Sequence, residues 1–418
     1  MGKGKTGILY CLQLALLLTM VSDVDAVERR RDQFIKQPGH YILPMPYRLP
    51  GIGEGFLLAG TLNNAHDSHT DYIGLAITGA IEGYGAIAKD IHLVEKHLIV
   101  DIFAQRISQA TTRNYNGRGM DTRPDDYTLV DLADAKYTAL RTTGTFYERM
   151  FEITGGAFRG ESRVDKIRSR DGVLIQELKE PASEFYFYMA SIAMDLTDDY
   201  RDPRVGIRYE ISRWWRDETA ANSSDFYRQE HNITGYVPVG RISTLALNYF
   251  RADAFVTRQG DTDLNSVKSR LGCDDPGLTA EQRSRCEQLA NNTVANNRYG
   301  SIGGLGGWSR LRSYPNDRYN GAHAEFYGAE FRWNLTEEFK PFDIGIAKDI
   351  RTGIQLAFFW ETATISDEKD KLGDHWRDSY GMGFRMVTAS GLVIRGDIAT
   401  GDEGSELSVI VGYPWEGF

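Results

Sequence analysis

The chain lacks the long hydrophobic run that a membrane-spanning helix needs. Its most sustained apolar stretch, residues 8–21, is about 14 residues long, whereas a helix needs about 20 to cross a bilayer. The mean hydropathy of the chain is −0.40. A helical membrane protein is therefore not expected. The low hydropathy is compatible with a membrane β-barrel, because only every second residue of a barrel strand faces lipid.

Residues 8–21 have the position and the flanks of a secretory signal peptide. Lys3 and Lys5 precede the stretch, and Ala26 ends a small-residue cleavage site. We therefore assign residues 1–26 to a signal peptide. Residues 27–50 contain four prolines, which cannot donate hydrogen bonds to a sheet, so this part is expected to be a leader segment and not a strand. Residues 51–418 are expected to form one domain.

Cysteine is scarce, and there is no excess of positive charge. Cys11 lies in the signal peptide, which leaves Cys273 and Cys286 on either side of a strongly polar segment. In an exported chain this pair favours a disulfide that closes a surface loop. A metal site is the weaker alternative, because no further cysteine or histidine pair stands at ligand spacing. The net charge is −10 without a basic stripe, so nucleic acid is not an expected partner.

The motifs of common enzyme classes are also missing. The sequence has no Gly-x-Ser-x-Gly, and its eight histidines form no recognisable catalytic triad. Its glycine runs do not stand between a strand and a helix, as nucleotide sites require. We therefore expect no enzymatic activity, no cofactor and no metal. The acidic stretch 195–206 does not have the spacing of a calcium loop, and a polar turn with Arg–Asp pairs is favoured.

Alternation of polar and apolar residues is abundant from residue 51 onward, which indicates an all-β chain. Connections alternate between short ones, such as residues 240–242, and long ones, such as residues 257–321. This asymmetry is typical of outer-membrane barrels, which have short periplasmic turns and long outer loops. At about 9–11 residues per strand, sixteen strands fit and fourteen remain possible. The strand count between residues 129 and 184 stays open.

The last five alternating segments distinguish a soluble sandwich from a membrane barrel. Each has one apolar face and one face with glycines and charges, and the segments are residues 322–335, 354–362, 380–387, 392–399 and 405–413. The charged faces together carry Glu330, Arg332, Glu361, Arg385, Arg395, Asp397 and Glu406. A dry core would hold so many charges only at a large desolvation cost, whereas a wet lumen accepts them. The sequence therefore predicts a transmembrane antiparallel β-barrel.

The long connection carries a motif. Gly306-Gly307 is followed by Leu311-Arg312-Ser313-Tyr314, at a spacing that resembles the sixth loop of the bacterial surface antigen superfamily. These are the barrels of BamA- and TamA-type insertases and of two-partner-secretion transporters. Residues 330–332 and 381–385 resemble the family's following strands. The resemblance covers residues 195–418 by motif and residues 51–195 by strand pattern alone.

The resemblance implies roles for the loop and for the charged inner face. Arg312 is expected to reach across the lumen to a carboxylate, with Glu361 as the first candidate and Glu330 as the second. Arg332, Arg385, Arg395 and Asp397 are expected to face the same lumen. Ser313 stands where the family has glycine, and Glu361 stands where the family has aspartate.

The end of the chain carries a second resemblance. Val409, Val411, Tyr413 and the final Phe418 resemble the aromatic signal by which membrane barrels are themselves assembled. In that arrangement Tyr413 is expected on the outer, lipid-facing side of the last strand.

The resemblance also implies a location and a function. We expect a bacterial outer-membrane barrel, surrounded by outer-membrane lipids, that assists protein insertion or translocation with a periplasmic partner or client protein. The family's POTRA domains, which capture clients, are too large to fit in residues 27–50. Their absence favours an alternative, a POTRA-less pore or structural barrel without insertase activity.

Overall fold

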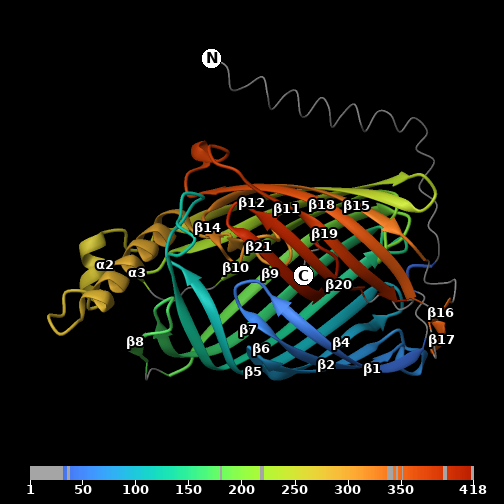
Figure 1. Ribbon diagram of the computed structural model, residues 1–418, viewed down its shortest axis with the longest axis horizontal. Coiled ribbons are helices and arrows are strands. Elements are labelled where there is room, and N and C mark those ends of the chain that lie inside the picture. Colours follow the sequence, from blue (N-terminus) through green and yellow to red (C-terminus); the bar gives the residue numbers. More distant parts are fainter. Residues whose placement is uncertain are drawn as a thin grey trace, which may run out of the picture.

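The computed structural model describes residues 32–34, 38–178, 181–216, 221–336, 342–344, 347–350, 352–388 and 393–415. Sixteen antiparallel strands close into a barrel, as predicted (Figure 1). In chain order they are β1 (Gly39–Leu49), β2 (Gly53–Asn63), β3 (Asp71–Gly79), β4 (Ile81–Val94), β5 (Leu98–Tyr115), β6 (Tyr127–Phe146), β7 (Phe151–Arg168), β9 (Ser183–Thr197), β10 (Gly206–Arg216), β11 (Asp225–Val239), β12 (Ser243–Arg258), β15 (His323–Asn334), β18 (Thr352–Ser366), β19 (Arg377–Thr388), β20 (Val393–Gly401) and β21 (Gly404–Val411).

Each strand pairs with its neighbours in the sequence, and β1 meets β21 to close the ring. A short extra strand, β8 (Leu174–Glu177), extends the edge of β7. The stretch between residues 129 and 184, whose strand count the sequence left open, therefore contains β6, β7 and β8. Among the described residues, no helix is long and apolar enough to cross a membrane.

The alternation predicted for the last segments is present in the barrel wall. Outward side chains such as Trp360, Tyr380 and Met382 are 47%, 55% and 58% exposed. Inward side chains of the same strands, such as Glu361 and Arg385, are fully buried. Because side chains alternate along a strand, this pattern places an apolar face toward lipid and a charged face toward the lumen.

The first 50 residues contain a strand that the sequence analysis did not predict. All eleven residues of β1 pair with β2, from Gly39↔Asn63 to Leu49↔Gly53. The expectation of a strand-free leader through residue 50 is therefore wrong. Pro44 and Pro46 lie within β1, and proline is tolerated in a strand at an edge, where a missing N–H group costs least. The predicted signal peptide lies outside the described residues.

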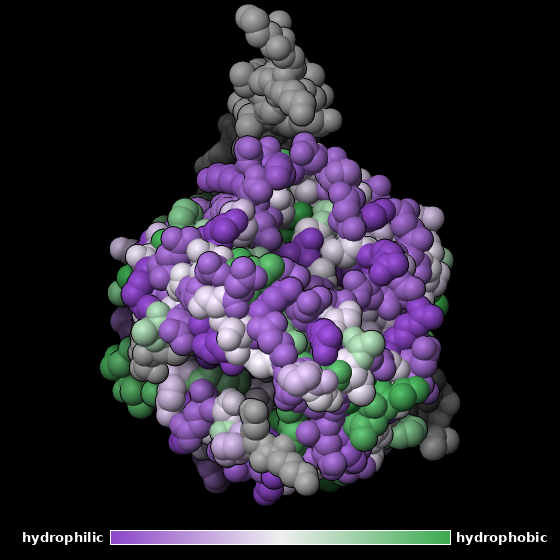
Figure 2. Space-filling model, turned by 90° about the vertical axis from the view of Figure 1, so that its left-hand side faces the viewer, coloured by the Kyte–Doolittle hydropathy of each residue, from purple (hydrophilic) through white to green (hydrophobic). Residues whose placement is uncertain are grey.

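The two ends of the barrel differ in the length of their connections. Between β12 and β15, α2 (Leu264–Arg270) and α3 (Ala280–Tyr299) project from one end, called here the outer end (Figure 1). Figure 2 views this end, and its surface is largely hydrophilic. Thr279 and Gln282 form a capping box that starts α3. The predicted disulfide is present and joins Cys273, in the turn after α2, to Cys286 in α3.

The remaining small elements lie in connections. The β12–β15 connection also contains β13 (Gly304–Leu305) and β14 (Tyr319–Asn320), which pair with each other. A hairpin of β16 (Phe342–Ile344) and β17 (Ala347–Ile350) lies between β15 and β18 at the opposite end. Two 3-10 turns are η1 (Ala65–Asp67) and η2 (Lys369–Lys371).

The chain after β21 turns into the lumen, against prediction. Gly412 has a φ of +104°, which ends the extended strand. Tyr413 is 6% exposed and donates a hydrogen bond from its hydroxyl to Asp202 Oδ1 at 2.7 Å. Tyr413 is therefore not on the lipid-facing side. Val411 does face outward, at 41% exposure, and Phe418 lies outside the described residues.

Candidate functional site

The loop motif folds back into the barrel through its glycines. Gly306 and Gly307 have φ values of +110° and +101°. A Cβ atom on Gly306 would lie 2.2 Å from the carbonyl oxygen of Pro315, so only glycine fits there. The next left-handed residue of the motif is Leu311, with a φ of +52°, and not Ser313. Ser313, which stands where the motif it resembles has glycine, is not among the residues with a positive φ and therefore needs no glycine.

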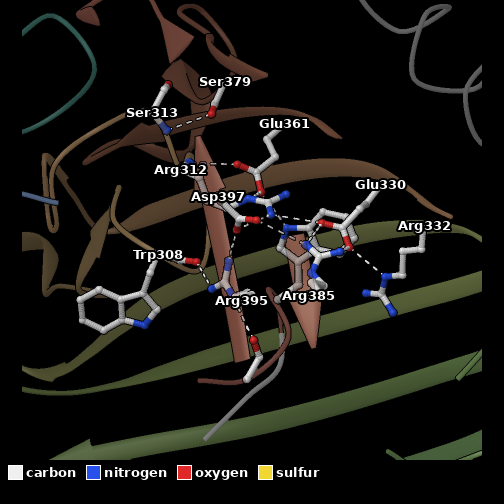
Figure 3. Close-up of polar contacts among 12 residues, drawn as sticks. Trp308, Arg312, Ser313, Glu330, Arg332, Glu361, Ser379, Arg385, Arg395 and Asp397 are labelled. Atoms are coloured by element: carbon white, nitrogen blue, oxygen red, sulfur yellow. Dashed lines mark hydrogen bonds and ion pairs between the residues drawn. The ribbon is translucent and has the colours of Figure 1, made fainter. Parts of the chain in front are cut away.

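Arg312 is the centre of the site. It binds Glu361 on β18 twice, from its backbone N–H to Oε2 and from Nε to Oε1, both at 2.9 Å. Its Nη1 reaches Glu330 Oε2 on β15 at 3.1 Å and Asp397 Oδ2 on β20 at 3.0 Å (Figure 3). The guanidinium also lies 3.4 Å from the ring centroid of Phe359, a cation–π distance. Arg312 therefore joins three strands of the barrel wall to the loop, and both predicted carboxylates are among its partners.

Glu330 is held by three arginines. Arg385 on β19 binds it in a bidentate pair, with Nη1–Oε1 and Nη2–Oε2 both 2.6 Å. Arg332 adds a hydrogen bond from Nε to Oε1 at 2.8 Å, and Arg312 completes the set. Bidentate arginine–carboxylate pairs are geometrically specific because the planar fork of the guanidinium matches the two oxygens. The pairing therefore fixes the relative positions of β15 and β19.

Arg395 extends the site toward the last strand. Its Nη1 binds Asp397, its Nη2 donates to the carbonyl oxygen of Trp308 in the loop, and its Nε donates to the carbonyl oxygen of Gly412 at 2.9 Å (Figure 3). One side chain therefore contacts β20, the folded-in loop and the segment after β21. We call the seven charged residues the lumen cluster; its members are Arg312, Glu330, Arg332, Glu361, Arg385, Arg395 and Asp397.

The lumen cluster is almost completely shielded from solvent, since its seven residues are 0–2% exposed. It contains four guanidinium groups against three carboxylates. Burial of ions is costly unless they are paired, and removing one partner of a buried pair typically costs about 3–5 kcal/mol. The cluster therefore holds the loop in one place and makes each member depend on the others.

The residues after Arg312 attach the loop to β19 and to the β20–β21 turn. The backbone N–H of Ser313 donates to Ser379 Oγ at 3.0 Å, and the Tyr314 hydroxyl donates to the carbonyl oxygen of Asp378 at 3.1 Å. Tyr314 is fully buried, and burial raises its pKa to about 12. The hydroxyl therefore stays protonated and able to donate at physiological pH.

A second loop arginine was missed by the sequence analysis. Arg318 binds Glu403 in the β20–β21 turn, with Nε–Oε2 at 2.7 Å and Nη2–Oε1 at 2.8 Å. It also donates to the hydroxyl and the carbonyl oxygen of Thr122. The Tyr319 hydroxyl donates to Glu403 as well, at 2.9 Å. The one signal in the sequence was a second arginine before an aromatic residue in the same loop.

Trp415 was missed too, because no strand pattern extends to it. The indole Nε1 donates to Glu361 Oε1 at 2.9 Å, the oxygen that also accepts from Arg312 Nε. The Trp415 side chain is 2% exposed. The site therefore combines the loop motif, the inner wall of β15–β20 and the end of the chain.

The acidic stretch 195–206 is a polar turn between β9 and β10. Asp198 Oδ1 accepts hydrogen bonds from the backbone N–H groups of Arg204 and Val205, and Asp195 pairs with Arg208 at 2.9 Å. The predicted Arg–Asp pairing is therefore present. Across the residues that the structure describes, no group of His, Cys, Asp or Glu side chains has the arrangement of a metal site.

Comparisons with known proteins address the fold. No protein-family model matches the chain, and no curated protein sequence matches it. Among solved structures, the chain is similar to CdiB from Escherichia coli, with a TM-score of 0.51 and 9% identity over 91% of this chain and 67% of that chain.

Two further solved structures are similar. CdiB from Acinetobacter baumannii has a TM-score of 0.48 and 9% identity over 90% of this chain and 65% of that chain. BamA from Haemophilus ducreyi lacking POTRA domains 1–3 has a TM-score of 0.46 and 11% identity over 92% of this chain and 76% of that chain. The similarity to CdiB from Escherichia coli shows that this chain shares the barrel fold of that protein.

Proposed function

We propose that this chain is a bacterial outer-membrane barrel that assists the insertion or translocation of other proteins. The observation that carries the proposal is the junction between β1 and β21, called here the seam. β21 pairs with β20 along all eight of its residues, whereas its register with β1 is limited to Arg48↔Val409. A seam with so little pairing is the part of the wall that opens at least cost.

The composition of β1 supports this reading. Two of its residues, Pro44 and Pro46, lack the N–H group that a strand needs for a ladder hydrogen bond. A strand with two missing donors is poorly suited to the middle of a continuous sheet and well suited to an edge. An edge that can open gives an incoming strand unpaired backbone groups to bind, the arrangement known as β-augmentation.

The lumen cluster, which lies on the β21 side of the seam, also supports the proposal. Glu330, Glu361 and Asp397 lie on the strands that lead up to β21, and they hold the loop against that wall. The loop therefore gives the wall beside the seam a fixed position, while the register between β1 and β21 is limited to one pair. We assign no catalytic step to the site, which acts by binding and by movement of strands.

Depletion of the protein in its own cells tests the proposal. We expect the level of some outer-membrane or surface proteins to fall, and the wild-type chain to restore it. The membrane and surface proteomes are compared by quantitative mass spectrometry. Membrane and surface proteomes that do not change on depletion would contradict the proposal.

A conducting pore is the second candidate, and the buried cluster argues against it. Arg312 and its partners cross the lumen with no exposed surface on their side chains. We therefore expect the purified barrel to conduct little current in a planar bilayer. A stable open conductance of the wild-type barrel would instead favour the pore.

A further inference from the structure

The segment that follows β21, residues 412–415, is bound inside the lumen at several points. Arg395 Nε donates to the carbonyl oxygen of Gly412 at 2.9 Å. The Tyr413 hydroxyl lies between Asp202 Oδ1 and Gln355 Oε1, at 2.7 and 3.2 Å. Asp202 belongs to the turn between β9 and β10, and its Oδ1 also accepts a hydrogen bond from Gln355 Nε2 on β18 at 3.1 Å. The N–H group of Gly412 still donates to the carbonyl oxygen of Val393 on β20 at 2.8 Å, so the segment leaves the sheet after Gly412 and turns into the lumen.

Trp415 reaches the far wall. Its carbonyl oxygen accepts a hydrogen bond from Asn232 Nδ2 on β11 at 2.7 Å, and its ring packs against Phe326 at a centroid distance of 6.2 Å. The wall of β15 has space for this ring only because residue 328 is glycine. A Cβ atom at Gly328 would lie 2.6 Å from Cζ2 of Trp415 and 2.8 Å from Cε2. The inner wall is therefore shaped to hold the indole.

The segment and the loop share one acceptor. Glu361 Oε1 accepts from both Arg312 Nε and Trp415 Nε1, each at 2.9 Å. Arg395 makes a second link, because it touches both the loop carbonyl of Trp308 and the carbonyl of Gly412. Any outward movement of the end of β21 must break contacts on Glu361 or on Arg395.

We propose that residues 412–415 form an internal latch that holds β21 in place and keeps the seam closed. When the latch is bound, the end of β21 is tied to β11, β15 and β18 as well as to β20. When it leaves, β21 keeps β20 and a single register pair with β1, and Glu361 loses one of its donors. The latch therefore couples the state of the seam to the binding of the loop, and it does so whether or not the barrel has the proposed function.

Distances between spin labels across the seam test the latch in the purified barrel. The labels are attached at Arg48→Cys and Val409→Cys, two outward positions, and the disulfide between Cys273 and Cys286 does not react with them. We expect the wild-type latch to give one short-distance population. Trp415→Phe removes the indole N–H group, and Gly328→Ala crowds the indole ring. Each substitution should raise the ratio of separated to paired seams about tenfold, because a hydrogen bond to a charged group contributes a free energy of that size.

Two substitutions serve as matched controls. Trp376→Phe removes an indole N–H that binds the carbonyl of Gly373 in an outer connection, and Gly235→Ala adds a methyl group where no atom lies within 4 Å. Both should leave the distance distribution unchanged. If Trp415→Phe does not fold, the distance distributions of Gly328→Ala and Tyr413→Phe test the latch instead. Latch variants that keep the wild-type distance distribution would overturn the proposal. If such variants also melt at a lower temperature, the segment has a purely structural role.

Discussion

Arg312 holds Glu361 with two hydrogen bonds of 2.9 Å, one from its backbone N–H and one from its side chain. The backbone bond fixes the path of the loop, and the side-chain bond adds the charge. Because both groups are fully buried, neither can exchange its partner for water. This pair is the contact on which the position of the whole loop depends.

Removal of the arginine should weaken the barrel strongly. Arg312→Ala leaves Glu361, Glu330 and Asp397 with fewer positive partners in a buried site, and we expect a loss of about 3–5 kcal/mol of unfolding free energy. Glu361→Gln keeps the shape and removes the charge, and should cost about 1–3 kcal/mol. The measurement is the temperature at which the compact gel migration of the barrel is lost. Arg106→Ala is the control, since its pair with Asp134 is half-exposed and should contribute at most about 1 kcal/mol. Wild-type behaviour in both lumen variants would refute the pairing.

The second loop arginine should hold the loop at its outer end. Arg318→Ala removes the bidentate contact with Glu403 and two hydrogen bonds to Thr122, so residues 306–320 should become more accessible. Limited trypsin digestion of the folded barrel should cut in this loop several-fold faster than in the wild type. Equal digestion rates would show that Arg312 suffices to hold the loop.

Reduction of the disulfide should act locally. Cys273 and Cys286, with a sequence separation of 13, close a segment that starts after α2 and runs into α3, outside the strands of the barrel. A crosslink that closes a loop of about this length typically stabilises the folded segment by about 3 kcal/mol, because it lowers the entropy of the unfolded chain. We expect reduction to make α2 and α3 sensitive to protease while the melting temperature of the barrel stays within a few degrees. A large fall in that temperature would show that the helices support the wall.

Tyr314 should make stability fall at alkaline pH. Burial raises its pKa to about 12, whereas an unfolded tyrosine titrates near 10. The folded chain therefore keeps a proton that the unfolded chain loses, so stability declines as the pH rises from about 10 to about 12. Tyr314→Phe lacks this group, and its stability should fall less over the same range. Parallel pH profiles of the two proteins would contradict the role given to the hydroxyl.

The inner and outer faces of the last strands were predictable because side-chain direction has a period of two. Glu330, Glu361 and Asp397 follow from that period alone once a membrane barrel is assumed. The same rule failed at Tyr413, because the strand ends at Val411 and Gly412 takes a left-handed conformation. Side chains alternate between the two faces only while the backbone remains an extended strand.

The other misses have different physical causes. β1 was rejected for its prolines, although an edge strand tolerates them, and edge position depends on where the ring closes. The contact between Arg318 and Glu403 joins residues 85 apart in the sequence, and no local pattern encodes it. Trp415 and Gly328 fit each other only after the chain has turned inward.

Closing the seam in living cells tests the central claim most directly. Arg48 and Val409 are Cα partners, so cysteines at both positions can form a disulfide across the seam. Cells that depend on this variant should lose outer-membrane or surface proteins when the pair is oxidised, as we also expect on depletion, and recover them on reduction. The two single-cysteine variants should behave as the wild type under both conditions. A seam that is fully crosslinked while those proteins stay at their normal level would contradict the account.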